Sequence, residues 1–338
     1  MKRILFYSSV NSLELFKTQK FYQIDISILK DLGYDVLLSN RIFDSLLFWK
    51  YDILFSYFYR YSFFAALLAK CFGKKTYFTG GIDSLDSAYA SAFNYKIQAL
   101  FFKLCYWVAD SCIIVSQSDL KNIFKVSSLK KKLSYSEHVI NTKLFIADVP
   151  KEKIFTSIVW MGDEGNVVRK GVDKALQIFA ELKKIPEFVD YRFVIIGRKG
   201  EGEVLVRSII DKYNLKGSVE LKGEVSEEDK INLLKQSKYY FQLSLYEGFG
   251  LAALEALCAN NIIIHSGKGG LANPIYKEQL LFDIDNDFDS ELLKLVNKLA
   301  CFTPITSYDN LLEYYDIQRR KDDFEAIIVN GKSNYKLK

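Results

Sequence analysis

The sequence predicts an α/β protein made of two doubly wound parallel sheets. Its 338 residues leave room for two domains, at roughly 100–200 residues per domain. Apolar residues make up 49% of the chain and charged residues 26%, as in an ordinary soluble globular protein. Short β-rich apolar runs alternate with helical patterns from end to end. Strands that are apolar on both faces and separated by helices are typical of a parallel sheet covered on both sides.

The first half of the chain holds one set of alternating elements. A helix is expected over 21–33 (FYQIDISILKDLG), and it ends at Gly33 as a helix C-terminus commonly does. The expected strands of this half are 3–7, 35–38, 52–55, 76–79, 112–115 and 138–140.

The second half repeats the pattern. Its expected strands are 155–160, 192–196, 218–221, 239–243, 262–265 and 280–283, and its expected helices are 171–184, 201–213, 226–237, 250–259 and 288–300. Charges and a proline in ADVPKEK (147–153) mark a linker, so we expect Rossmann-like domains at 1–150 and 151–312. We expect them to face a cleft at the carboxyl ends of their strands, the usual place for a ligand.

Cysteine and histidine usage argues against a metal or disulfide framework. The 5 cysteines are odd in number and show no CxxC spacing, which favours a reducing compartment. With 2 histidines there is little scope for a histidine-rich metal centre, so no metal is expected. The apolar run at the N-terminus breaks at Ser8, and no stretch approaches the ~20 apolar residues that span a bilayer. We expect a cytoplasmic protein with no nucleic-acid partner.

Charge is placed unevenly along the chain. Residues 1–150 hold 19 Lys and Arg against 12 Asp and Glu, whereas the remainder holds 27 against 29. Aromatic residues crowd into 46–70 of the same half. A basic, aromatic first domain could rest on an anionic membrane surface. Core aromatics beneath a solvated basic face explain the composition equally well, and both interpretations stay open.

The stretch YEGFGLAALEALCANN (246–261) carries the clearest chemical signal. A strand ends near Leu243 and a helix begins at about Gly250, with Gly248 two residues before it. These glycines let a ligand approach the backbone, and the first N–H groups of the helix form an anion site. A phosphate-bearing ligand therefore fits here. Taken alone, Glu247 could simply complement the helix dipole, and Glu255 could be an exposed helix residue.

The longer segment 218–264 resembles the donor half of retaining glycosyltransferases with the GT-B fold, most closely family 4. The resemblance rests on two glutamates spaced as E-x7-E within EGFG-x4-E. It implies that Glu247 contacts the transferred sugar and that Glu255 holds the nucleotide ribose. It also implies that backbone amides of the turn bind the donor diphosphate, at Gly248, Phe249, Gly250 and Leu251.

A second match to this family covers 159–184 (VWMGDEGNVVRKGVDKALQIFAELKK). There the family has an arginine and a lysine that neutralise the pyrophosphate. Lys170 fits the lysine, Asp163 stands at the arginine position, and Arg169 is our candidate for the missing charge. The chemistry needs such cations because the leaving nucleoside diphosphate gains negative charge as the glycosidic bond breaks.

Other segments match in outline. The resemblance places Gly197 at the base pocket and the backbone near Lys222 at the base, whereas Arg198 could bind the nucleotide or equally be a loop charge. It also implies that 313–338 carries a helix crossing back onto the first domain. In FTGGIDS (78–84) there is no counterpart of the family's histidine. The candidates for the acceptor side are Gly80, Gly81 and Asp83, although GGID could equally be a simple turn.

Together these features predict a retaining, metal-independent glycosyltransferase. It would use a UDP- or GDP-linked sugar as donor substrate, with no cofactor, and a saccharide or lipid-linked acceptor. Two alternatives stay open. One is a nucleotide-sugar 2-epimerase on the same fold. The other is a non-catalytic partner subunit that binds nucleotide-sugar, an idea motivated by Asp163 and by SSVNS (8–12) in place of the family's glycine pair.

Overall fold

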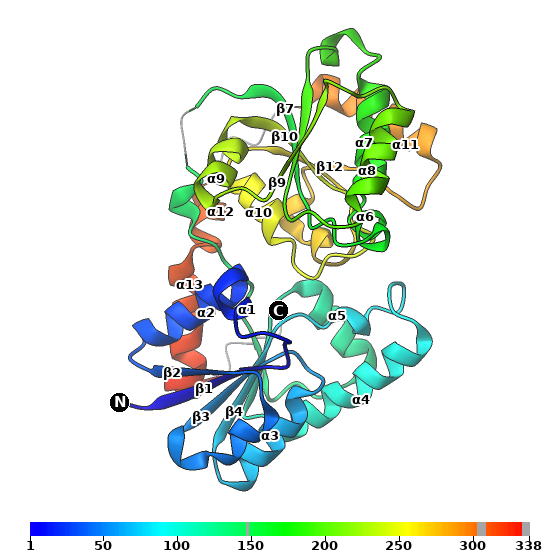
Figure 1. Ribbon diagram of the computed structural model, residues 1–338. Helices are drawn as coiled ribbons and strands as arrows, with labels where there is room; N and C mark the ends of the chain where they lie inside the picture. The colour runs from blue at the N-terminus through cyan, green and yellow to red at the C-terminus, as the bar shows by residue number, and fades with distance from the viewer. Residues whose placement is uncertain (147–148, 303–308, 333–338) are drawn as a thin grey trace. The chain divides into compact units, whose positions relative to one another are not determined.

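A computed structural model describes residues 1–146, 149–302 and 309–332 of the chain. The chain forms two compact units, one of Met1–Ile140 with Tyr314–Lys338 and one of Asn141–Glu313 (Figure 1). Each unit contains a six-stranded sheet whose paired strands all run parallel. The chain thus has the α/β architecture expected from the alternating pattern.

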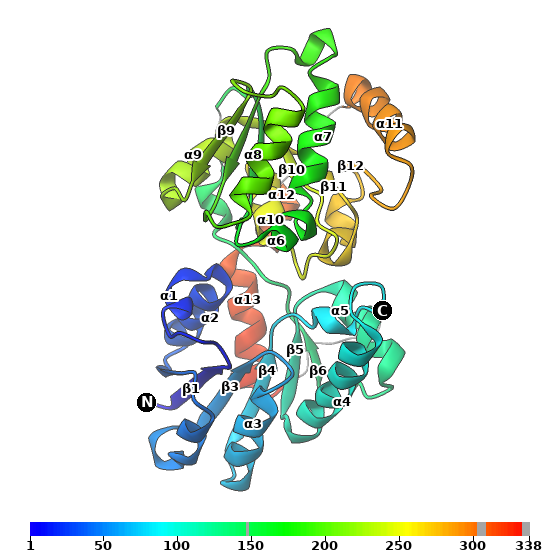
Figure 2. The same ribbon diagram turned by 45° about the vertical axis from the view of Figure 1, so that its right-hand side comes forward.

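The sheet of the first unit has the order β2-β1-β3-β4-β5-β6. Its strands are β1 (Arg3–Ser8), β2 (Asp35–Ser39), β3 (Ile53–Tyr57), β4 (Lys75–Thr79), β5 (Ser111–Ile114) and β6 (Leu133–Tyr135). Its helices are α1 (Leu15–Thr18), α2 (Lys20–Asp31), α3 (Ser62–Cys71), α4 (Ala92–Val108), α5 (Gln117–Val126) and α13 (Ile317–Phe324). One core layer packs α3, α4 and α5 on one face of the sheet, and the other packs α2 and α13 on the opposite face (Figure 2).

The expected strand over 138–140 is wrong, and the sixth strand is β6 instead. Ser134 of β6 is buried, but its hydroxyl shares a 2.9 Å hydrogen bond with the Ser111 hydroxyl of β5. This pairing lets a polar residue lie inside the sheet, where an apolar pattern cannot reveal it. Ile140 forms only an isolated bridge, with Asp316.

The terminal helix α13 belongs to the first unit, where it packs against α2. Its Arg320 is fully buried and holds Asp25 of α2 through two bonds, Nε–Oδ1 at 2.7 Å and Nη2–Oδ2 at 2.8 Å. The chain changes unit after Ile140 and after Glu313, whereas we expected the boundaries after 150 and after 312. Parts of the expected linker (147–148) and of the terminal segment (333–338) lie outside the described residues.

The sheet of the second unit has the order β12-β11-β10-β7-β8-β9. Its strands are β7 (Glu152–Ile158), β8 (Arg192–Ile196), β9 (Val219–Gly223), β10 (Ser237–Gln242), β11 (Ile262–His265) and β12 (Leu280–Leu281). Its helices are α6 (Glu164–Arg169), α7 (Val172–Leu182), α8 (Glu203–Lys212), α9 (Glu227–Gln236), α10 (Leu251–Cys258), α11 (Phe288–Cys301) and α12 (Asp309–Tyr314). In its core, Phe155 stacks on Tyr239 and Phe241 with ring centroids 4.6 and 5.1 Å apart.

The aromatic stretch 46–70 is divided between core and surface. Leu54, Phe55, Tyr57, Tyr59 and Phe63 are buried, so much of the aromatic content serves packing. Trp49, Tyr61 and Phe64 are exposed. Within the described residues, no helix has both the length and the apolar character needed to cross a bilayer.

Candidate nucleotide-sugar site

The glycine turn of the second unit joins β10 to α10. Gly250 is the N-cap of α10 with φ 89° and ψ 45°, a left-handed conformation that favours glycine. The first intrahelical bond runs from the Leu254 N–H to the Gly250 carbonyl at 2.9 Å. The N–H groups of the three preceding helical residues therefore have no acceptor within the helix. This geometry fits the anion site expected at Gly248, Phe249, Gly250 and Leu251.

A second glycine pair supports this turn from the neighbouring loop. A Cβ at Gly269 would lie 2.2 Å from the Glu247 carbonyl oxygen, and the Gly270 N–H donates to that oxygen at 2.6 Å. A Cβ at Gly270 would lie 2.6 Å from the Phe249 backbone. The loop after β11 must therefore lack side chains where it contacts the turn. Sequence reasoning missed this pair, although KGG (268–270) shortly after a strand was a usable signal.

The structure brings Glu247 and Lys170 together. The Lys170 Nζ lies 2.7 Å from Glu247 Oε2, and both side chains are mostly buried. The same oxygen accepts hydrogen bonds from Gln242 Nε2 and Ser244 Oγ, each at 3.1 Å. Gln242 and Ser244 were not predicted. They fix the carboxylate of Glu247 from the end of β10.

Lys170 reaches Glu247 because its segment packs directly on the end of β10. Gly171 has φ 69°, and a Cβ there would lie 2.0 Å from the Leu243 carbonyl oxygen. The Leu245 N–H donates to the Arg169 carbonyl at 2.8 Å. The Arg169 guanidinium instead turns to Asn166, where Nη2 lies 2.6 Å from Oδ1. Asp163, at the position where the family has an arginine, accepts the Asn166 N–H as the N-cap of α6.

Glu255 is neither exposed nor isolated. Only 6% of the residue is accessible, and both carboxylate oxygens contact the Lys230 ammonium of α9, at 2.7 and 2.8 Å. The interpretation as an exposed helix residue is therefore wrong. Lys230 also lies 3.0 Å from Glu227, one turn earlier on its own helix. No sequence motif marked Lys230, because a lysine on a surface-patterned helix is ordinary.

The residues predicted near the nucleotide base lie on or directly after β8 and β9, and backbone contacts fix the two that follow β8. Gly197 has φ 129°, and a Cβ there would lie 2.0 Å from the Val159 carbonyl oxygen. The Arg198 carbonyl accepts the Met161 N–H at 2.9 Å, which continues the β7–β8 contact. Lys222 lies on β9 with its Nζ 3.7 Å from Glu220. Packing alone thus explains the glycine at 197, and the base contacts stay a prediction.

The acceptor-side candidates follow β4 in the first unit. Gly80 has φ 101°, and a Cβ there would lie 3.1 Å from the rings of Tyr57 and Phe58. A Cβ on Gly81 would lie 3.2 Å from Asp83 Oδ1 and 3.9 Å from Asp119 Oδ2, so both carboxyl groups face the same bare backbone. Sequence reasoning missed Asp119, which lies in the first turn of α5.

Asp119 is a buried acid with one oxygen unsatisfied. It is fully buried, and its Oδ1 accepts the Ile82 N–H at 3.3 Å. Its Oδ2 has no hydrogen-bond partner among the described residues. Burial, assisted by the nearby charge of Asp83, raises the pKa of Asp119 to about 8. Near neutral pH this carboxyl is therefore largely protonated.

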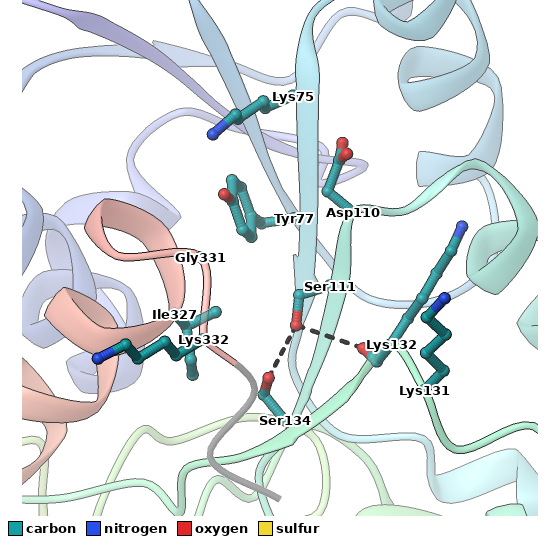
Figure 3. Close-up of a pocket in the computed structure, with 10 residues that line it drawn as sticks. All are labelled: Lys75, Tyr77, Asp110, Ser111, Lys131, Lys132, Ser134, Ile327, Gly331 and Lys332. Atoms are coloured by element: carbon teal, nitrogen blue, oxygen red, sulfur yellow. Dashed lines mark hydrogen bonds between the residues drawn. The ribbon is translucent and has the colours of Figure 1, made fainter.

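Two cavities lie away from these residues. Figure 3 shows one of about 250 Å³ at the amino ends of β4 and β5, lined by Lys75, Tyr77, Asp110, Ser111, Lys131, Lys132, Ser134, Ile327, Gly331 and Lys332. Its Lys132 ammonium is held by the carbonyls of Tyr106 and Trp107. Another of about 280 Å³ lies beside α8 and β9. Neither is lined by a predicted site residue.

Comparisons with known sequences match part of the chain. The family model of the group 1 glycosyl transferases matches residues 165–299. A GDP-mannose:cellobiosyl-diphosphopolyprenol alpha-mannosyltransferase of Xanthomonas oryzae is 32% identical over 42% of this chain and 40% of its own length. The GPI3 component of the phosphatidylinositol N-acetylglucosaminyltransferase of Saccharomyces cerevisiae is 27% identical over 38% of this chain and 28% of its own length. The matched segments therefore span less than half of these relatives.

Solved structures match along nearly the whole chain. Anabaena HepE in complex with UDP-glucose has a TM-score of 0.72 at 12% identity, covering 98% of this chain and 100% of that one. A sucrose-phosphate synthase of Thermosynechococcus elongatus has a TM-score of 0.66 at 16% identity, covering 98% and 97%. At such identities the likeness defines the fold. The chain therefore has the GT-B fold, and residues 165–299 of its second unit match the model of the group 1 glycosyl transferases.

Proposed function

We propose that this chain is a retaining, metal-independent glycosyltransferase whose second unit binds a UDP- or GDP-linked sugar. The observation that carries the proposal is the Lys170–Glu247 pair beside the open amino end of α10. The Lys170 ammonium and the first N–H groups of α10 support the binding of a diphosphate at this turn, with the Glu247 carboxylate beside them.

Each group has a role in this proposal. The α10 N–H groups and Lys170 stabilise the charge that develops on the departing nucleoside diphosphate. Glu247, fixed by Gln242 and Ser244, meets the transferred sugar. The diphosphate itself accepts the proton of the acceptor. Arg169, which is bonded to Asn166, would have to turn to add a second cation.

The ribose would be held by Glu255. A carboxylate with two oxygens can accept hydrogen bonds from a pair of neighbouring hydroxyls. In the structure these oxygens contact Lys230, so this lysine orients the carboxylate before the nucleotide arrives. Lys230 then acts as a positioning residue.

For the acceptor we propose a lipid-linked saccharide or a cell-surface saccharide precursor, bound by the first unit. The names of the two relatives above specify a diphosphopolyprenol and a phosphatidylinositol. Such an acceptor implies a cytoplasmic protein with peripheral contact to the inner face of a membrane. Gly80, Gly81 and Asp83 remain its candidate contacts, and the buried Asp119 lies behind Gly81.

A non-catalytic subunit that binds nucleotide-sugar is the second candidate. It is favoured by Asp163, whose carboxylate caps α6 where the family has an arginine for the pyrophosphate. Such a subunit would bind the donor without releasing the nucleotide.

Thermal unfolding with UDP, GDP and ADP, and with their sugars, tests the proposal. A nucleotide at about 100 times its dissociation constant should stabilise the second unit by roughly 2.7 kcal/mol. Glu255→Gln should weaken nucleotide binding, whereas Glu247→Gln should mainly lower turnover with an acceptor extract. Lys216→Met is the matched control, an exposed lysine paired with Asp211 on the same unit.

The outcomes separate the candidates. Binding with acceptor-dependent nucleotide release supports the transferase, and binding without release supports the non-catalytic subunit. If no nucleotide raises the melting temperature, or if both glutamine variants behave like the control, the site assignment is wrong.

A further inference from the structure

Helix α4 of the first unit exposes an apolar stripe. Phe93, Leu100 and Trp107 are 72%, 57% and 68% accessible, which is high for such large apolar side chains. They are spaced by seven residues, which is about 20° short of two full turns, so they form one line about 21 Å long. The opposite side of α4 packs into the core through Phe102, Cys105 and Tyr106, among others. The outer face of the helix therefore carries a line of large apolar side chains in addition to those on its core side.

Positive charge accompanies this line. Lys96 and Lys103 are exposed and follow Phe93 and Leu100 by three residues each, on the same face. At the end of the helix, the Lys132 ammonium donates to the Trp107 carbonyl at 2.9 Å. The helix contains no acidic residue, and the aspartate after it, Asp110, is neutralised by Lys70 at 3.0 Å.

Helix α4 packs beside the neighbouring helix α3. Figure 2 shows α3 and α4 on the same side of the first sheet. Phe101 of α4 lies 6.2 Å between ring centroids from Tyr61 and also from Phe64, both of which are exposed. Phe101 thus links α4 to two exposed aromatic residues at the start of α3. We call Phe93, Lys96, Leu100, Lys103 and Trp107 the α4 stripe.

We propose that the α4 stripe lies in the plane of an anionic lipid surface, with its three apolar side chains inserted between head groups. Lysine is depleted at protein–protein interfaces, whereas lysines beside tryptophan and phenylalanine suit a lipid interface, where the ammonium stays in water. Charge complementarity therefore selects anionic lipid over a second copy of the chain. The inference deepens the proposed function, because it names the surface that would make the membrane contact. Binding of the α4 stripe to lipid requires neither the sugar donor nor the saccharide acceptor.

Flotation of the full chain on vesicles tests the proposal. The chain should float with vesicles of phosphatidylcholine containing phosphatidylglycerol and much less with phosphatidylcholine alone. F93S/L100S/W107S should lower partitioning at least ten-fold without changing the melting temperature. Lys96→Gln and Lys103→Gln should each lower it roughly five-fold, the factor that ~1 kcal/mol per charge corresponds to. The matched control is V189S/V204S/L293S, three exposed apolar residues of the second unit.

Tryptophan fluorescence locates the contact. The chain has 3 tryptophans, so W49F/W160F leaves Trp107 alone and W49F/W107F leaves Trp160 alone. On anionic vesicles, Trp107 emission should shift to the blue and be quenched by brominated lipid, whereas Trp160 emission should not.

Several results would overturn the proposal. One is equal flotation of the triple variant and its control. Another is Trp107 emission that stays unchanged on vesicles. A third is a triple variant that alters only the molecular mass in solution, which would identify a second copy as the partner. Because nucleotide binding is not measured, failure here leaves the proposed donor site standing, and the reverse also holds.

Discussion

The two glutamates of the candidate donor site, Glu247 and Glu255, differ in their hydrogen-bond partners and in their burial. Glu247 has three donors on a single oxygen and retains some solvent access, whereas Glu255 is buried with both oxygens on one ammonium. The spacing of the two glutamates was readable in the sequence. Their partners Gln242, Ser244 and Lys230 were not, because a hydrogen bond between side chains on different elements leaves no local pattern.

Asp119 gives a prediction about pH. A carboxyl with a folded-state pKa of about 8 and an unfolded pKa near ~4 binds a proton more tightly in the folded protein. The free energy of unfolding that Asp119 adds through this raised pKa is fully present below pH ~4 and is lost as the pH rises toward 8. Asp119→Asn keeps the neutral form, so its free energy of unfolding relative to the wild type should rise by a few kcal/mol between pH 4 and 8.

Urea unfolding at several pH values measures this difference. Asp44→Asn serves as the control, since its carboxylate accepts the Ser39 hydroxyl at 2.6 Å elsewhere in the same unit. A constant difference between Asp119→Asn and the wild type across this range would contradict a protonated Asp119.

At the scale of elements, the strands are largely predictable because they are apolar on both faces. Most of them could be read from runs such as RFVII, which forms β8 (Arg192–Ile196) without change. The predictions of secondary structure failed where polar side chains form hydrogen bonds inside the fold, as in β6, or where an element is short. Helix α6 was missed because its EGNVVR contains only one buried residue, Val167.

Gly171 tests how closely α7 must approach β10. Gly171→Ala adds a Cβ 2.0 Å from a backbone oxygen in a left-handed conformation, so neither the side chain nor the carbonyl can yield locally. We expect a loss of more than ~3 kcal/mol of stability in the second unit. Gly217→Ala is the control, because Gly217 has φ 85° but nothing within 4 Å. It should cost only ~1–2 kcal/mol. Equal losses in chemical unfolding would contradict a steric role at position 171.

At the scale of the whole molecule, the repeated strand–helix pattern predicts two sheets, and the structure contains two. The pattern cannot show that a helix near the end of the chain packs against a helix near its beginning. Asp25 and Arg320 are separated by 295 residues and carry charges that normally mark a surface. Their pairing became visible only in the folded unit.

Removing this pair should affect one unit only. Arg320→Met leaves the buried Asp25 carboxylate without its counter-charge, which costs ~3–5 kcal/mol. In scanning calorimetry we expect the transition of the first unit to fall by roughly 6–20 °C. The transition of the second unit, which Gly171→Ala should shift instead, stays in place. D25N/R320M should recover part of the loss, and a joint shift of both transitions would argue against separate folding units.

The same pair sets an order for folding during synthesis. The second unit, Asn141–Glu313, is continuous in sequence and leaves the ribosome complete. The first unit begins earlier but cannot be completed until α13 has been made, since Arg320 is fully buried within it. A nascent chain therefore carries the carboxylate of Asp25 for almost 300 residues of elongation before its cation exists. The unit that is translated first is the one that finishes folding last.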